Sequence, residues 1–289
     1  MARCRMAAAA AARRTARTIV ILHASVDDVA SLEPWVRSGI FLATISTLAL
    51  AERRRPRRPN RSTRSRFTNV ALLLLNTLLV RAITTTSLIA VAVTAQTMQW
   101  GALTHVAAPT WIEFAIAILL LDAGMYLQHR LFHLVPWFWR LHAVHHSDTA
   151  FDVTTGIRFH PGEILLSLAI KAAVVVALGA SPWAVLVFEA LLSSASLFEH
   201  SNVRIAPRID ALLRHAIVTP DVHRVHHSVE RDEHNRNFGF LLLWWDRLFH
   251  TYRAVPRGDA STMPIGLSAF RSDADQQLHS LIVQPFSAR

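Results

Sequence analysis

Histidines at short, helix-like spacings are the residues of this chain best suited to chemistry. Eight of its 16 histidines fall into three groups. These are the pair His129 and His133, the triplet His142, His145 and His146, and the triplet His223, His226 and His227. Residues spaced i, i+3 and i+4 share one face of an α-helix, so each group would present its imidazole rings together.

Clustered imidazoles predict the binding of transition metals. Neutral imidazole suits iron, zinc, copper and nickel, and ligand type alone does not separate iron from zinc. Eight ligands exceed the three or four protein ligands of one zinc site, so we expect two metal ions. The single cysteine, Cys4, excludes a disulfide framework and a cysteine-ligated metal site.

The composition favours a membrane protein. The apolar fraction is 52% and the charged fraction only 17%. Eight arginines lie between Arg53 and Arg66, and this run separates two apolar stretches. We therefore interpret the run as a cytoplasmic loop that contacts anionic lipid headgroups, rather than as an arm for nucleic acid, which we do not expect as a partner.

Apolar segments predict an all-α, multi-span membrane helical bundle with about four to five membrane segments. The candidate spans are 35–51, 69–95, 110–127, 161–179 and 183–198. The second span contains Arg81, so it would tilt or form a helical hairpin. Residues 1–32 are expected to be a poorly ordered leader, and residues 33–289 a single membrane domain with its histidine-rich region at about 115–255.

These spans place the histidine groups on one side of the membrane. With the arginine run in the cytoplasm, the third span brings His129 and His133 back to the cytoplasmic face, and the last two spans form a hairpin that ends at His200. The remaining chain would form a cytoplasmic helical cap that carries the other histidines. In a bacterium this membrane would be the inner, or cytoplasmic, membrane.

Two metals beside an apolar bundle suggest chemistry on a lipid chain. Oxygen activation at iron would allow attack on an unactivated C–H bond, while the protein supplies coordination and a shaped apolar cavity. We find no nucleotide fingerprint and no haem or flavin motif, so the electrons would come from a separate redox partner.

Several segments resemble the fatty acid hydroxylase superfamily, which includes sterol desaturases and sphingolipid hydroxylases. The resemblance covers about 35–286 and is densest over 122–252. The matching segments are Asp122–His133, Leu141–Ser147, Arg158–Glu163 (the R-x-H-P-x-E element), Phe198–Asn202 (the H-x-N element), Thr219–Ser228, Asn237–Gly239 and Trp244–Phe249. The departures include His250, where relatives usually carry glycine, and Ser196, where some carry a further histidine.

The resemblance implies a non-haem, O2-dependent membrane oxidoreductase that holds two iron ions, with zinc possible in the isolated protein. The electron donor would be of the ferredoxin or cytochrome type, and the product would be a hydroxylated or desaturated lipid. The substrate would be a sterol-like lipid, a sphingolipid or a fatty acyl chain. His200 is the expected ninth ligand, since it follows a helix end on the same side as the three groups.

Four further residues are predicted to support the ligands. Metal-bound imidazoles usually donate their second N–H to a carboxylate or a carbonyl. Asp122 lies two helical turns before His129, on the same face, and we expect it to orient a ring. Glu163 and Asp221 are candidates for the same role. His160 precedes a proline, which disfavours helical geometry, and it would be a structural or supporting group.

Two other classes of protein remain open from the residues alone. A histidine-rich metal transporter would place ionisable residues near the middle of the bilayer. A zinc-dependent membrane hydrolase would need a general base and one metal with an open position.

Overall fold

The computed structural model describes residues 26–59, 63–84 and 86–287 as helices joined by loops. Within these ranges there is no strand beyond three isolated bridges, which confirms the predicted all-α class. In chain order the elements are α2 (Val26–Arg54), α3 (Thr63–Ile83), α4 (Leu88–Thr97), η1 (Ala102–His105), α5 (Thr110–Leu134), α6 (Pro136–His146), η2 (Val153–Ile157), α7 (Pro161–Leu178), α8 (Pro182–Glu199), α9 (Pro207–Leu213), α10 (Pro220–His226), α11 (Arg231–His234), α12 (Trp244–Leu248), α13 (Leu278–Val283) and η3 (Gln284–Phe286). The predicted leader, 1–32, lies outside the described residues up to residue 25, and its last residues begin α2.

Five segments of the described chain are long and apolar enough to cross a membrane, as predicted. They are Ser31–Arg54, Arg64–His105, Thr110–Leu134, Pro161–Leu178 and Pro182–Glu199. Large apolar side chains on them face outward; Leu42 is 60% exposed and Leu78 is 68% exposed. An apolar outer surface suits lipid rather than water. The chain is an integral membrane protein.

The second span is a broken helix rather than a hairpin. It is interrupted between Ile83 and Leu88; α3 packs against η2 and α7, and α4 against α2, α7 and α8. Beyond α4, Gly101 lies so close to Gly179 that a Cβ on Gly101 would collide with the Gly179 backbone. The chain therefore reaches the far end of the bundle in two pieces, and Arg81 lies exposed in the last turn of α3.

Proline and glycine set the helix boundaries near the histidines. Proline occupies the first turn of α6, α7, α8 and α10, where its missing N–H removes no helical hydrogen bond. α7 ends at Gly179, whose φ of +66° is the left-handed conformation that terminates helices. The position of His250 also has a left-handed φ, +57°, the conformation that favours the glycine expected there from the resemblance.

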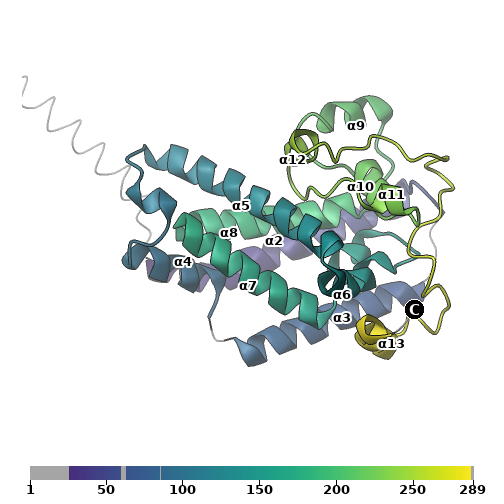
Figure 1. The fold of residues 1–289 in the computed structure, drawn as a ribbon, viewed down its shortest axis with the longest axis horizontal. Coiled ribbons are helices and arrows are strands. Elements are labelled where there is room, and N and C mark those ends of the chain that lie inside the picture. Colours follow the sequence, from purple (N-terminus) through teal and green to yellow (C-terminus); the bar gives the residue numbers. More distant parts are fainter. Residues whose placement is uncertain (1–25, 60–62, 85, 288–289) are drawn as a thin grey trace, which may run out of the picture.

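The apolar core lies between α4, α5, α7 and α8. Ile89, Leu121, Met125 and Phe188 are each at most 2% exposed and belong to one buried cluster. Figure 1 shows the long helices side by side, with the short helices α9 to α12 gathered at one end of the bundle. The core thus fixes the long helices, and these present their ends to the short ones.

Several arginines of the run between Arg53 and Arg66 bond to segments distant in the chain, among them the short helix α10. Arg57 pairs with Asp221 of α10 at 3.1 Å, and Arg66 pairs with Asp152 at 2.6 Å. Arg58 donates to the Ser261 carbonyl at 2.8 Å and to the Met263 carbonyl at 2.7 Å. The run therefore has an internal structural role, and its predicted contact with lipid headgroups remains a prediction.

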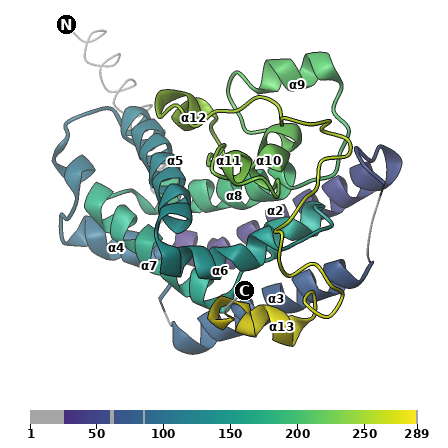
Figure 2. The ribbon, with the colours of Figure 1, turned by 45° about the vertical axis from the view of Figure 1, so that its right-hand side comes forward.

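All of the histidine groups lie at the same end of the bundle as the arginine run. The end of α5, α6, the start of α7 and the end of α8 meet there under α10 and α11 (Figure 2). His200 belongs to this end because it caps α8. The predicted gathering on one side is confirmed in the geometry of the fold, and the cytoplasmic orientation of that side remains a prediction.

Candidate metal centre

The structure brings all nine predicted ligands into two adjacent clusters. The first cluster comprises His129, His133, His142, His146 and His226; the second comprises His145, His200, His223 and His227. Within each cluster the candidate ligand atoms lie within 4.8 Å of one another. Eight of the nine rings are buried, and the ninth, His133, is half-buried.

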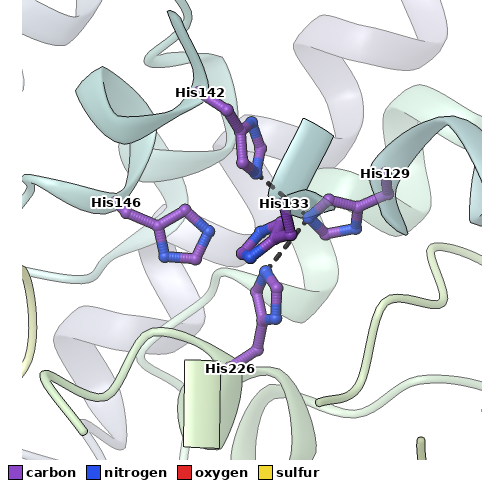
Figure 3. A group of neighbouring side chains, drawn as sticks. All are labelled: His129, His133, His142, His146 and His226. Carbon is purple, nitrogen blue, oxygen red and sulfur yellow. Dashed lines mark hydrogen bonds between the residues drawn. The ribbon is translucent and has the colours of Figure 1, made fainter. Parts of the chain in front are cut away.

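Two other ligand candidates of the first cluster lie close to His129. Its Nε2 is 3.1 Å from Nε2 of His142 and 3.0 Å from Nε2 of His226. Figure 3 shows the five rings converging from α5, α6 and α10.

In the second cluster, the three other rings all lie close to His200. Its Nε2 is 3.0 Å from Nε2 of His145, 3.0 Å from that of His223 and 3.2 Å from that of His227. The cap of α8 therefore faces rings from α6 and α10, and His200 joins the two triplets.

Each H-x-x-H-H triplet contributes to both clusters. On α6, His142 and His146 belong to the first cluster and His145 to the second. On α10 the assignment is reversed, because His226 belongs to the first cluster and its neighbours His223 and His227 to the second. Consecutive helical positions differ by about 100° in direction, so adjacent histidines at the end of a helix can serve neighbouring sites.

Backbone and side-chain oxygens hold most of the rings in one tautomer. The Nδ1 of His129 donates to the Phe238 carbonyl at 2.8 Å, and that of His226 donates to the Arg236 carbonyl at 2.6 Å. In the second cluster, Nδ1 of His200 donates to its own helix at the Ser196 carbonyl, 2.6 Å away. Because Nδ1 carries the proton, Nε2 of each ring keeps a free lone pair for a metal.

Glu163 lies where the sequence predicts a supporting carboxylate. Its Oε1 accepts from Nδ1 of His142 at 2.6 Å, and both side chains are buried. His160 caps the same helix, since its Nδ1 accepts from the Gly162 N–H and its Nε2 donates to the Ile282 carbonyl. His160 therefore supports α7 and, through it, Glu163, and it belongs to neither cluster.

Replacing Glu163 with glutamine is expected to lower metal affinity roughly 10- to 100-fold, the usual effect of losing such a partner. Glutamine can still accept from Nδ1 of His142 but removes the negative charge that makes the ring a stronger ligand. Chelator competition on the purified protein measures this affinity. Glu230→Gln, at an exposed glutamate, is the matched control, and equal affinity in the two variants would contradict the role.

Asp122 and Asp221 bond to groups other than the imidazole rings, which corrects the sequence-based expectation for both. Asp122 accepts from the N–H groups of Leu241 and Leu242 and from the Trp245 indole at 2.8 Å. It thus holds the segment before α12 against α5. Asp221 pairs instead with Arg57 and with the buried Arg224. Asp122 therefore bonds to a segment distant in the chain, and Asp221 to one distant arginine and one arginine of its own helix.

Sequence reasoning missed Glu199. This fully buried carboxylate lies 3.8 Å from Nδ1 of His200 and 3.7 Å from Nδ1 of His223. Neither of its oxygens has a hydrogen-bond partner within the described residues. An unpaired acid at the end of an apolar helix, directly before a ligand candidate, was the signal that could have identified it.

The cluster rings outside the spans are neutral. Burial lowers the pKa of His142 and that of His200 to about 3. Burial, together with the neighbouring imidazoles, also lowers the pKa values of His145, His146, His223, His226 and His227. Neutral imidazole is the form that binds metal, so no proton has to leave these rings first.

The donor set fits two transition-metal ions. Nε2 atoms that carry lone pairs and lie 3.0–3.2 Å apart repel one another unless a cation lies between them. With metal–nitrogen bonds of about 2.1 Å, adjacent ligand atoms of an octahedron lie about 3.0 Å apart. Both ring nitrogens of His146 and Nε2 of His133 also lack a partner within the described residues, as free ligand atoms would.

Five apolar spans with two imidazole clusters at one end define an integral membrane protein whose site suits transition metals. The model of the fatty acid hydroxylase family matches residues 114–251. The chain is 30% identical over 267 residues to ornithine lipid hydroxylase OlsE of Rhizobium tropici, an alignment that covers 86% of this chain and 75% of that protein. The chain belongs to the fatty acid hydroxylase family, and it is an O2-dependent oxidoreductase of that family.

Other relatives are similar over about half of the chain. Human alkylglycerol monooxygenase is 29% identical over 145 residues, which are 50% of this chain and 31% of that protein. Cholesterol 25-hydroxylase of Rattus norvegicus is 26% identical over 142 residues, which are 49% of this chain and 47% of that protein. The chain thus spans less than half of these two relatives. No solved structure matches the chain.

Proposed function

We propose that this protein is a di-iron lipid hydroxylase that uses O2 and electrons from a separate donor. The observation that carries the proposal is the pair of imidazole clusters at the end of an apolar bundle, with the ring tautomers held by carbonyls and by Glu163. Nine imidazole ligands in two groups suit two ions of a metal such as iron.

Hydroxylation is favoured over desaturation by the names of the relatives. Those given above are a lipid hydroxylase, a monooxygenase and a sterol hydroxylase. In a hydroxylation one atom of O2 enters a C–H bond, and the other leaves as water with two electrons and two protons. Bound iron would supply the oxygen activation, and the electrons would come from a ferredoxin- or cytochrome-type partner.

The chain's own residues have three tasks in this chemistry. The imidazoles present lone pairs without first releasing protons, Glu163 and the backbone carbonyls hold the rings in place, and burial of eight rings excludes bulk water. Water exclusion protects reactive oxygen species from side reactions.

Neither of the other classes fits the site as well. A transporter would carry its ionisable ligands at the middle of the bundle, whereas both clusters lie at one end. A zinc hydrolase would leave one metal with three ligands and a free general base, whereas the clusters hold five and four imidazoles.

The test is a lipid analysis of cells that express the protein under isotopically heavy O2. One lipid class should gain a single labelled oxygen atom with the wild type and with His279→Ala, an exposed histidine that belongs to neither cluster. His145→Ala should abolish that product. Identical lipid profiles for all three proteins, or a label that comes from water, would overturn the proposed function.

A further inference from the structure

The first cluster reaches the surface at one ring. His133 is the half-buried member of the nine, and it lines a cleft of about 530 Å³ together with residues of α6, α11 and the C-terminal segment. This volume falls within the range of small-molecule sites, roughly 300–1,000 Å³. Trp139 forms a wall of the cleft, with its ring 4.9 Å from that of His133.

The cleft is basic. Arg140 and Arg231 line it, and none of its lining residues within the described part of the chain carries a carboxylate side chain. Neither arginine takes part in an ion pair within the described residues. Two guanidinium groups with no acid partner favour a phosphate or a carboxylate as the ligand.

A buried donor supplies an independent indication of a ligand. Gln284 is 4% exposed and lines the cleft. Its Oε1 accepts from the Ser147 hydroxyl at 3.1 Å, but its Nε2 has no partner within the described part of the chain. Buried N–H groups are nearly always paired, so this amide is suited to an acceptor that enters the cleft.

The apolar residues around the cleft are suited to the membrane interface. Trp137 is 65% exposed and Leu134 is 67% exposed at the corner between α5 and α6. The Arg140 guanidinium lies over the Trp137 ring, 4.9 Å from its centre. Exposed tryptophan next to arginine is typical of the headgroup level of a bilayer, where a lipid can keep its tail in the membrane while its polar end leaves it.

We propose that this cleft binds an anionic group, a phosphate or a carboxylate, at the polar end of the lipid substrate, through Arg140, Arg231 and Gln284. The inference rests on the proposed lipid hydroxylation and specifies its substrate class. The carbon that approaches His133 then lies near the polar end of the lipid rather than at the tip of its tail.

A binding measurement tests the proposal without turnover. The purified, metal-loaded full-length protein is equilibrated with vesicles of equal parts phosphatidylglycerol and phosphatidylcholine that carry the same acyl chains, and the lipid that co-purifies is quantified by mass spectrometry. The wild type should enrich phosphatidylglycerol, and the Arg140→Gln/Arg231→Gln variant should lose that enrichment roughly tenfold, the effect of a lost charge-assisted contact. Arg204→Gln/Arg208→Gln, at two exposed arginines, is the matched control and should keep it.

Other arms separate the remaining explanations. Glycerol 3-phosphate should displace the bound lipid weakly, and equally tight binding of this soluble anion would overturn the assignment to a lipid. The assignment to a lipid would also be overturned if the cleft variant kept its lipid preference but its metal centre were reduced more slowly by an acidic ferredoxin. The cleft would then be a docking site for the electron donor. If the cleft variant enriches phosphatidylglycerol as the wild type does, while metal binding and hydroxylation are intact, this inference alone is refuted. A wild type that holds no metal or forms no product refutes the proposed function instead.

Discussion

Replacing His226 with alanine is expected to remove metal from the first cluster and to abolish turnover. Its Nε2 lies 3.0 Å from Nε2 of His129, and its ring is packed 4.6 Å from that of His146. Loss of a supporting partner already lowers metal affinity about 10- to 100-fold, and loss of a ligand should exceed that. Elemental analysis of the purified variant should find about one metal ion per chain or fewer, against about two in the wild type.

The control for this experiment is His279→Ala, because His279 is exposed and outside both clusters. It should keep both ions and full activity. Full metal occupancy in the His226 variant would exclude this histidine as a ligand. Circular dichroism of both variants separates loss of metal from loss of the helical fold.

Replacing Arg158 with methionine is expected to destabilise the fold by about 3–5 kcal/mol, the usual effect of removing one partner from a set of buried charges. The side chain is fully buried and donates from Nε to the Val144 carbonyl and from Nη2 to the Ser147 hydroxyl, each at 2.8 Å. Burial alone would raise the pKa of Asp148, but the charge of Arg158 and several hydrogen bonds hold it below its usual value. Methionine would leave that carboxylate buried without its counter-charge.

Thermal unfolding in detergent measures this effect. Arg158→Lys should restore little of the lost stability, because an ammonium group cannot reproduce the spread of the guanidinium donors. Arg208→Met, at an exposed arginine of α9, should unfold at the wild-type temperature. A lysine variant as stable as the wild type would show that charge alone, and not the hydrogen-bond geometry, is what the end of α6 requires.

Much of the fold and of the centre could be predicted because helical periodicity is local. The i, i+3, i+4 spacing placed the two triplets on helix ends, and the apolar segments predicted five spans. The position of His200 followed from counting crossings. The division of each triplet between two clusters could not be predicted, because it depends on how α6 and α10 are rotated against each other.

The partners of buried acids were the least predictable part of the site. Asp122 is on the expected helix face, yet it bonds to the segment before α12 rather than to a ring. Asp221 forms an ion pair with Arg57. Arg57 belongs to the arginine run for which the sequence predicted contact with lipid headgroups. Such pairings join residues far apart in the chain, so no local pattern encodes them.

The alternation of neighbouring histidines between the clusters makes the two centres one unit. Ordering α6 and α10 around one cluster also places the rings of the other, since His145 and His146, and likewise His226 and His227, share a backbone. The second ion should therefore bind a partly assembled site, so that metal loading is cooperative. For the same reason neither metal centre can be separated from the other. A shift of α6 or α10 by a single residue would exchange ligands between the two clusters. A protein with one metal ion could not arise by deleting the segments that form one cluster.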